Sequence, residues 1–344
     1  MKPKTYIGID YHKRYSVASA VDERGARLLE RRIEGNSAHL FELYLSSLPG
    51  EKHVVFEACR NWARLYETLE PMGCVASITL SHPYKTRAIA EAKVKTDRLD
   101  ARMLATLLRG DLVAKAHICS KASRSAKSGL RQRMYWVKLR TGIRNRVHSL
   151  IDRQADLRLP QVSDIFGARG MKALREAKLP ASERRLLDQD LEMLEGLGRC
   201  IKAIEQAGKR RSDPRLDWLQ SLPGVGPTLS AVIVAEIDDA SRFRSAAKLC
   251  SYAGLVPSVR ASGGKCYHGK MVAMSNKWLK WAFVEAAWVA VGRDAYFGSI
   301  YKSLRLRGKP ASKAISAVAR RMCSIAWHLL RERRAYRKTL PVSL

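Results

Sequence analysis

Over the first 110 residues, segments with the apolar pattern of a strand alternate with segments that have the apolar spacing of a helix. Short apolar runs, which are typical of strands, occupy five segments: 5–10, 15–21, 27–33, 53–57 and 75–80. Helical spacing of apolar residues predicts four further segments: 37–47, 61–72, 83–92 and 97–109. The stretch Asp22-Glu23-Arg24-Gly25 between the second and third runs is a turn signal, so these two strands are predicted to form a hairpin.

The order of these segments predicts the fold class of the N-terminal part. Three antiparallel strands followed by alternating helices and strands is the order of an α/β domain of RNase H-like (RuvC-like) type. We assign this domain to residues 1–112. In that fold the first and fourth strands are neighbours, and ligands collect at the carboxyl ends of such strands.

Residues 113–211 are predicted to be a helical coiled-coil segment. Apolar residues recur at helical spacing over 121–156, and ten Lys or Arg lie between Lys121 and Arg153. A second helix is predicted to begin with Ser182 as its N-cap. The two helices would pair antiparallel, either as a dimerising coiled coil or as a hairpin packed on its own chain. Residues 157–180 carry little signal.

The third predicted domain, 212–344, is mainly helical. Its segment Leu222-Pro223-Gly224-Val225-Gly226-Pro227 is similar to the turn of a helix-hairpin-helix element, in which two glycines let the backbone approach a phosphate. A plain helix–helix turn is the alternative. Gly263-Gly264-Lys265 is not a P-loop, because Cys266 replaces the Ser or Thr and the first glycine is misplaced.

Four carboxylates stand where local patterns end strands or begin a helix. Asp10 and Glu57 close the first and fourth apolar runs, and Asp97 and Asp100 share one face of the helix at 97–109. Packed carboxylates repel one another unless a divalent cation neutralises them, and oxygen ligands suit Mg²⁺ or Mn²⁺. The sequence therefore predicts a metal site for phosphoryl transfer, with scattered surface acids as the alternative.

The charge of the chain indicates a polyanionic partner. The sequence has 63 Lys and Arg against 32 Asp and Glu, a net charge of +31. Residues 1–110 carry +5 and residues 241–344 carry +18. No apolar run approaches the roughly 18 residues of a spanning helix and no signal peptide is recognised, so we expect nucleic acid rather than a membrane. Seven dispersed cysteines without a Cys-x-x-Cys pair argue against zinc and disulfides and favour a reducing cytoplasm.

Taken together, several motifs resemble the DEDD transposases of insertion sequences, the family of bridge-RNA-guided serine recombinases. The motifs are Gly8-Ile9-Asp10, Phe56-Glu57-Ala58-Cys59, Lys95 to Ala101, Leu222 to Gly226, and Ala253 to Pro257. Ser262-Gly263 matches the position of the family's nucleophilic serine; from the residues alone, Ser-Gly-Gly is an ordinary loop. The family's usual Ser-Lys followed by Gly-Asn is here 271–276, in which only Asn276 matches.

The resemblance implies a magnesium-dependent transposase. Asp10, Glu57, Asp97 and Asp100 would hold the metal, and Ser262 would attack phosphorus to form a phosphoserine link. Donor and target DNA would be chosen by a structured non-coding guide RNA, in a dimer or tetramer whose sites are shared between protomers. The location would be the prokaryotic cytoplasm, with nucleoid association when DNA is bound. An RNase H-like nuclease or Holliday-junction resolvase using metal-activated water is the alternative, and a non-catalytic nucleic-acid-binding protein is a third.

Overall fold

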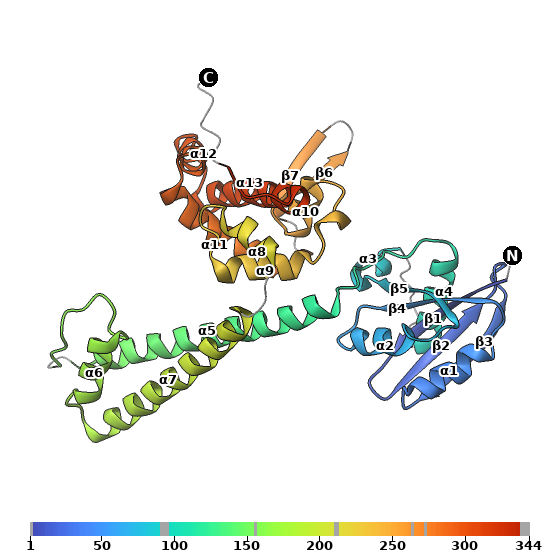
Figure 1. Cartoon of the computed structure of the whole chain (residues 1–344), viewed down its shortest axis with the longest axis horizontal. Helices are drawn as coiled ribbons and strands as arrows, with labels where there is room; N and C mark the ends of the chain where they lie inside the picture. The colour runs from blue at the N-terminus through green and yellow to red at the C-terminus, as the bar shows by residue number, and fades with distance from the viewer. Residues whose placement is uncertain are drawn as a thin grey trace. The chain divides into compact units, whose positions relative to one another are not determined.

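The computed structural model describes residues 3–89, 96–154, 157–209, 213–262, 265–271 and 274–337. The chain divides into two compact units (Figure 1): unit 1 is Met1–Ile118 and unit 2 is Cys119–Leu344. Unit 1 is a mixed α/β domain and the described part of unit 2 is mainly helical, which confirms the predicted order of fold classes. The predicted boundaries at 112 and 211 stay predictions.

Unit 1 is built on a five-stranded sheet with the order β3-β2-β1-β4-β5. Its elements are β1 (Lys4–Tyr11), β2 (Tyr15–Val21), β3 (Arg27–Glu34), α1 (Ala38–Ser46), β4 (Glu51–Glu57), α2 (Trp62–Leu69), β5 (Val75–Ser81), α3 (Pro83–Arg87) and α4 (Asp97–Arg109). β1, β2 and β3 pair antiparallel, whereas β4 and β5 run parallel to β1. The predicted adjacency of the first and fourth strands is therefore confirmed. Of the predicted helix at 83–92, α3 forms the first part, and residues 90–95 lie outside the described residues.

Side-chain alternation along the central strands creates two apolar layers. Ile7, Ile9 and Phe56 point to the face covered by α1 and α2, where they join the larger core of this unit. Val55 points to the other face and packs with Leu104 and other residues of α4. The N-terminus of α4 is capped by Thr96, whose hydroxyl accepts from the Leu99 N–H at 3.2 Å.

A glycine in β1 lets α4 lie directly on the sheet. A Cβ atom at Gly8 would stand only 2.0 Å from the carbonyl oxygen of Ala101 and 2.6 Å from the backbone nitrogen of Ala105. A side chain of any size would therefore push the helix away from the strand. Gly8 thus sets the distance between the first turn of α4 and the end of β1, where the predicted acids lie.

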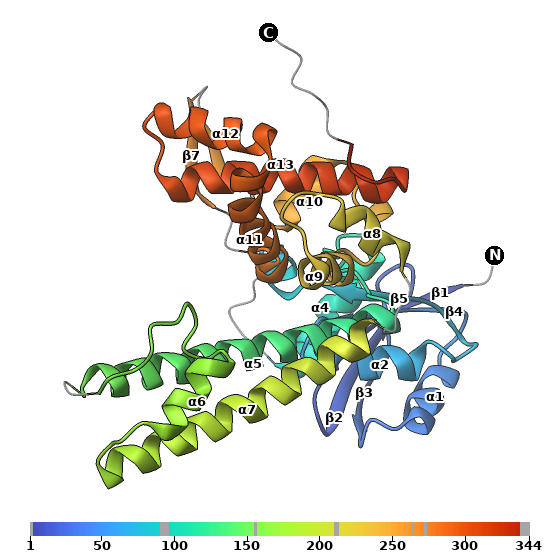
Figure 2. The same cartoon turned by 60° about the vertical axis from the view of Figure 1, so that its left-hand side comes forward.

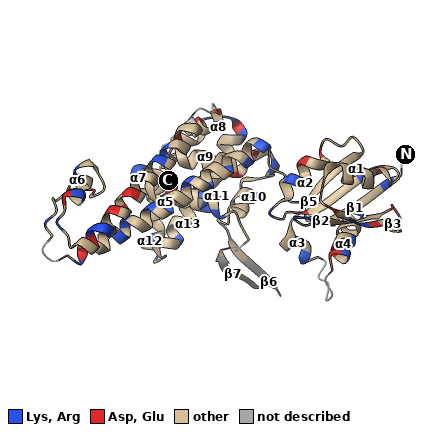
Figure 3. Ribbon diagram, turned by 90° about the horizontal axis from the view of Figure 1, so that it is seen from below, with Lys and Arg blue, Asp and Glu red and all other residues tan. Residues whose placement is uncertain are grey.

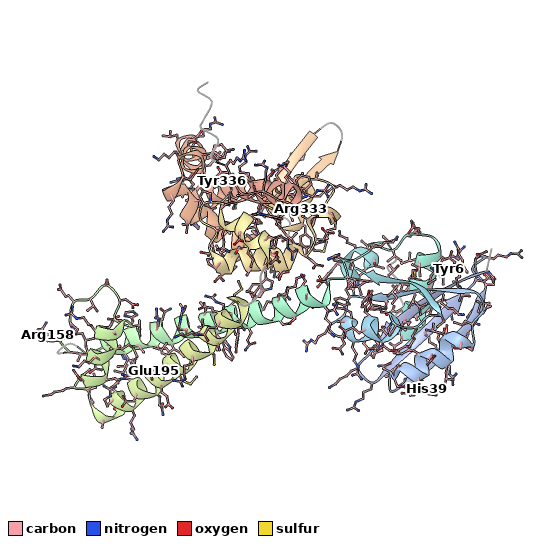
Figure 4. The ribbon with its side chains drawn as sticks, in the orientation of Figure 1. Tyr6, His39, Arg158, Glu195, Arg333 and Tyr336 are labelled. Atoms are coloured by element: carbon pink, nitrogen blue, oxygen red, sulfur yellow. The ribbon has the colours of Figure 1, made fainter. Side chains whose placement is uncertain are left out.

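Unit 2 begins with a long helical hairpin, in which α5 (Lys121–Asp152) and α7 (Ala181–Lys209) run side by side (Figures 1 and 2). The predicted helical pair is confirmed. Ser182 is not its N-cap, because the helix already begins at Ala181 and the Arg184 N–H donates to the Pro180 carbonyl. A short helix, α6 (Ala168–Glu176), lies in the stretch with little sequence signal, and its Arg175 pairs with Glu195 of α7. Glu195 is labelled in Figure 4.

The rest of unit 2 packs around one apolar core. Its elements are α8 (Pro214–Gln220), α9 (Pro227–Ile237), the 3₁₀ helix η1 (Ala240–Arg242), α10 (Ala246–Tyr252), β6 (Pro257–Ser262), β7 (Lys265–Met271), α11 (Lys277–Arg293), α12 (Ala295–Leu306) and α13 (Ala311–Glu332). Leu130 and Met134 of α5 pack against this core, so the hairpin is joined to it by apolar contacts. Among the described residues, no helix combines the length with the apolar composition that crossing a bilayer requires.

The glycine-rich turn between α8 and α9 is explained by packing within unit 2. Gly224 has φ +84°, and a Cβ there would lie 2.2 Å from the carbonyl oxygen of Ala286 on α11. Ser230 is buried and donates from its hydroxyl to the Pro227 carbonyl at 3.0 Å. A phosphate contact of helix-hairpin-helix type at this turn stays a prediction.

Candidate functional site

Two neighbouring strand ends and the first turn of a helix form the rim of a cleft in unit 1. Asp10 lies near the end of β1, and Glu57 is the last residue of β4, which runs parallel to β1. Asp97 and Asp100 lie in the first turn of α4. All four side chains line one cleft of about 850 Å³. The structure thus brings the four acids selected from the sequence to one place.

His12 and Tyr15 connect two of these carboxylates. Nε2 of His12 lies 3.1 Å from Oδ2 of Asp10 and 3.3 Å from Oδ2 of Asp97. The Tyr15 hydroxyl donates to the same Asp97 oxygen across 2.9 Å, and the Arg32 guanidinium lies 3.7 Å from the centre of the Tyr15 ring. Asp97 belongs to α4, yet its carboxylate is fixed by residues of the β1–β2 hairpin.

The electrostatics of the cleft centre on Asp10. Burial is the largest influence on its pKa and raises it. The neighbouring His12 opposes this, but the negative charges of Asp97 and Asp100 add to the increase, and the net pKa lies above the ordinary value. The ionised carboxylate is therefore disfavoured in the folded unit, and a cation in the cleft would reverse that effect.

The pKa of Tyr15 is also changed by the carboxylates of the cleft. Its pKa is raised, first because its hydroxyl donates to Asp97 and then by burial and by the carboxylate charge. Deprotonation would lose that hydrogen bond and place two negative charges together. Tyr15 is thus held as a neutral donor that orients Asp97.

The donor set fits a hard divalent cation. Ligand atoms of Asp10, His12 and Asp97 all lie within 4.8 Å of one another. Carboxylate oxygens suit Mg²⁺ or Mn²⁺, whereas imidazole is the preferred ligand of softer metals. His12 is therefore better suited to hold the carboxylates by a hydrogen bond than to bind Mg²⁺ itself.

Sequence reasoning missed both His12 and Tyr15. His12 follows Asp10 by two residues, and in an extended chain residues two apart share a side, so this spacing was an available signal. The sequence contains no comparable signal for Tyr15. Its contact with Asp97 depends on how the β1–β2 hairpin packs against a helix 82 residues later in the chain.

Ser262 belongs to unit 2, whereas the four acids belong to unit 1. It is the last residue of β6, and the antiparallel register places it opposite Lys265 of β7. Residues 263 and 264, which join the two strands, lie outside the described residues. The predicted nucleophile therefore stands at the end of a two-stranded hairpin, and its catalytic role stays a prediction.

Asn276, the one residue that matches the family's pattern after this hairpin, is held within the fold of unit 2. Its Oδ1 accepts from the Leu279 N–H at 3.0 Å and caps α11, while Nδ2 donates to Glu236 at 2.8 Å. Glu236 is buried on α9 and also pairs with Arg131 of α5 at 2.8 Å. These bonds account for Asn276 without a phosphate, and they tie the segment after β7 to the helical hairpin.

Two family models match the chain. One, described as "Transposase IS116/IS110/IS902 family", matches residues 216–302 in unit 2. The other, described as "Transposase" and covering the DEDD type of IS110, matches residues 7–154, which include the acidic cleft.

Individual relatives agree with these matches. The chain is 30% identical over 187 residues to the insertion element IS116 uncharacterized 44.8 kDa protein of Streptomyces clavuligerus, covering 53% of this chain and 47% of that protein. It is 25% identical to the transposase for insertion sequence element IS1111A of Coxiella burnetii, over 98% of this chain and 92% of the relative. It is 31% identical to the pilin gene-inverting protein of Moraxella bovis, over 37% of this chain and 40% of the relative. The chain thus covers less than half of the IS116 relative, whereas it covers nearly all of the IS1111A transposase.

Proposed function

We propose that this chain is a transposase of the IS116/IS110/IS902 family and that it cuts and rejoins DNA strands for an insertion sequence. The observation that carries the proposal is the meeting of Asp10, Glu57, Asp97 and Asp100 in one cleft. The sheet order β3-β2-β1-β4-β5, with its first three strands antiparallel, supports an RNase H-like (RuvC-like) assignment for this unit.

In this proposal the acids act on the scissile phosphate. A bound Mg²⁺ or Mn²⁺ would supply positive charge against the negative charge that develops on the phosphoryl oxygens. Asp10 and Asp97 would hold the ion, and Glu57 and Asp100 would complete its oxygen ligands. His12 and Tyr15 keep Asp10 and Asp97 in place, so that their geometry does not have to form during the reaction.

Ser262 would be the nucleophile. Its Oγ forms a bond to phosphorus while the bond from phosphorus to the 3′ oxygen breaks. The serine loses its proton, and the 3′ oxygen gains one and leaves as a hydroxyl. The phosphoserine link keeps the phosphodiester bond energy, so rejoining to another 3′ hydroxyl needs no nucleotide. Because Ser262 and the acids belong to different units, we propose that protomers of a dimer or tetramer share their sites.

A second candidate is an RNase H-like nuclease or Holliday-junction resolvase that uses metal-activated water. The observation in its favour is that the described residues lining the cleft include no serine. The acids with a bound metal would suffice for hydrolysis. The two functions are therefore distinguished by whether the cut DNA end is joined to the protein or is free.

The test is to trap the protein on DNA. Cells make the chain from a plasmid that holds its gene with the flanking DNA, and the plasmid is recovered under denaturing conditions. We expect protein-linked DNA with the native chain and none with Ser262→Ala, because only the serine oxygen forms the link. Ser258→Ala, a change in the same strand, is the matched control and should keep the adduct. Cleavage by Ser262→Ala without any adduct would falsify the serine mechanism and favour the nuclease.

A guide RNA is proposed from the family and from the charge of +31. Base pairing would then choose the DNA sequence while the protein contacts backbone and shape. We expect RNA that copurifies with the chain to be one species encoded beside its gene, with segments complementary to the DNA it joins. The measurement is sequencing of the bound RNA, and an unselected mixture of cellular RNA would contradict this part of the proposal.

A further inference from the structure

One stripe of α5 in the α5–α7 hairpin changes from apolar to basic residues partway along its length, while Leu197 and Ile201 of α7 remain buried. Near the far end, Val147 of α5 packs in an apolar core with Leu187 and Leu191 of α7. One and two turns earlier on the same stripe of α5 stand Arg144 and Arg140, at spacings where a paired helix ordinarily has apolar residues. Basic positions along this hairpin are blue in Figure 3. This stripe of α5 therefore carries two guanidinium groups at positions where apolar side chains would ordinarily pair the helices.

A cavity of about 410 Å³ lies between the two helices at this level. Arg133 and Arg140 line it from α5, and Gly198, Lys202 and Glu205 line it from α7. A Cβ atom at Gly198 would meet no atom within 4 Å. The glycine is therefore not required by close packing, and its missing side chain leaves the cavity open.

The cavity holds more positive charge than the chain itself neutralises. Glu205 accepts from Nε of Arg133 at 2.8 Å and is used in that pair. Arg140 makes no hydrogen bond or ion pair with any other residue that the structure describes. Burial lowers the pKa of Arg140, the positive charges of Arg144 and Arg133 lower it further, and the negative charge of Glu205 opposes this only in part. A half-buried guanidinium that forms no ion pair with a described carboxylate favours an anion beside it.

We propose that this cavity binds a phosphate group of a nucleic-acid backbone, with Arg140, Arg133 and Lys202 as the contacts. The planar guanidinium of Arg140 can give two parallel hydrogen bonds to phosphate oxygens. The other candidate occupant is an acidic side chain from a second copy of the chain. A second copy carries the same net charge of +31, so electrostatics favours nucleic acid. The inference rests on the proposed function only for the origin of the phosphate.

Two glycines of α7 provide a test that leaves every charge in place. Gly198→Met fills the cavity, whereas Gly196→Met adds the same side chain outside it, where a Cβ has only the end of the Arg199 side chain near 4 Å. Both substitutions improve helix propensity, so neither should unfold the hairpin. Arg140→Met removes the cation directly.

The full-length variants are titrated with a 20-base-pair DNA duplex and with an RNA duplex of the same sequence, over a series of KCl concentrations. We expect Gly198→Met and Arg140→Met to lower the slope of log affinity against log salt by about 0.9 with at least one duplex, the loss of one phosphate contact. Gly196→Met should keep the native slope. The duplex for which the slope changes identifies DNA or RNA as the source of the bound phosphate.

Three results would overturn the inference. One is an unchanged slope in all variants with both duplexes. A second is that the variants differ from the native chain only in how much inorganic phosphate raises the melting temperature. That result would mean that the cavity is a site for small anions. A third is a change in oligomer mass, by sedimentation equilibrium, without a change in slope, which would mean a second copy. None of these measurements needs catalysis, so they are independent of the Ser262 adduct test.

Discussion

Asp10 is the residue on which the cleft's electrostatics depends most directly. Its side chain is 24% exposed, against 41% for Asp97, so it is the less hydrated of the two acids joined by His12. Burial and the nearby acids raise its pKa. A carboxyl pKa that is raised by folding means that, at neutral pH, the charged group destabilises the folded unit. Binding of a cation in the native state reverses the sign of this contribution.

Asp10→Asn should therefore separate stability from metal binding. Without metal, we expect the melting temperature to stay equal or rise, because a repelled charge is removed. The native chain should gain about 2.7 kcal/mol at a Mg²⁺ concentration 100 times its dissociation constant, and Asp10→Asn should lose most of this gain. Thermal unfolding of the full chain in EDTA and in MgCl₂ measures both effects.

Asp111→Asn is the control for this experiment, because Asp111 is an exposed acid of the same unit that does not line the cleft. It should keep the magnesium gain of the native chain. If Asp10→Asn keeps the same gain, Asp10 does not bind the metal.

At the scale of elements, the site depends on how closely α4 lies on β1. Asp97 and Asp100 are supplied by the helix, whereas Asp10 is supplied by the strand. Gly8 permits the close approach, since a Cβ there would overlap the Ala101 carbonyl oxygen. A change in this one contact alters the distance between the acids without touching any of them.

Gly8→Ala should consequently weaken both the fold and the site. The added methyl group has no room between strand and helix, and overpacking of this kind costs about 1–3 kcal/mol. We expect a lower melting temperature and, in addition, a smaller stabilisation by Mg²⁺, because the helix must move away from Asp10. Thermal unfolding with and without MgCl₂ measures both.

Gly73→Ala is the matched control, because a Cβ there would meet nothing within 4 Å. It should not lower the melting temperature. A Gly8→Ala chain that is destabilised but keeps the full magnesium gain would show that the acids do not depend on this helix contact.

At the scale of the whole molecule, the two units differ in charge. Residues 1–118 have 19 basic and 14 acidic side chains, a net +5, whereas residues 119–344 have 44 and 18, a net +26. The carboxylate cleft belongs to the first unit and the proposed phosphate cavity to the second. Attraction for nucleic acid and the acidic chemistry are thus assigned to different parts of the chain.

Fragments should separate these two properties. The fragments are divided after Ile118, because the Ala116 N–H donates to the Leu80 carbonyl and both Ala116 and Ile118 pack on the core of unit 1. Fragment 1–118 should fold and be stabilised by Mg²⁺, yet bind DNA weakly. Fragment 119–344 should bind DNA with a steep salt dependence and cut nothing. Thermal unfolding and fluorescence anisotropy measure these outcomes, and tight binding by fragment 1–118 would contradict the division.

The local pattern of the sequence determined most elements of unit 1 and the choice of the four acids. Strand and helix periods and the Asp22–Gly25 turn are set by neighbouring residues, so they can be predicted without the fold. The adjacency of Asp10 and Glu57 followed from strand order. The N-cap of α7 was misplaced by two residues, since the carbonyl of Pro180 rather than that of Ser182 accepts the first helical hydrogen bond.

Only the tertiary structure decided which distant side chains meet. Tyr15 and Asp97 are 82 residues apart, and their hydrogen bond requires both the pairing of β1 with β2 and the close packing of α4 on Gly8. Likewise, the sequence shows Arg140 as one cation among many, and only the structure places it in a cavity lined by Gly198 of α7. The physical reason is the same in both cases: periodicity fixes which face a residue occupies, while its partners depend on contacts between elements far apart in the chain.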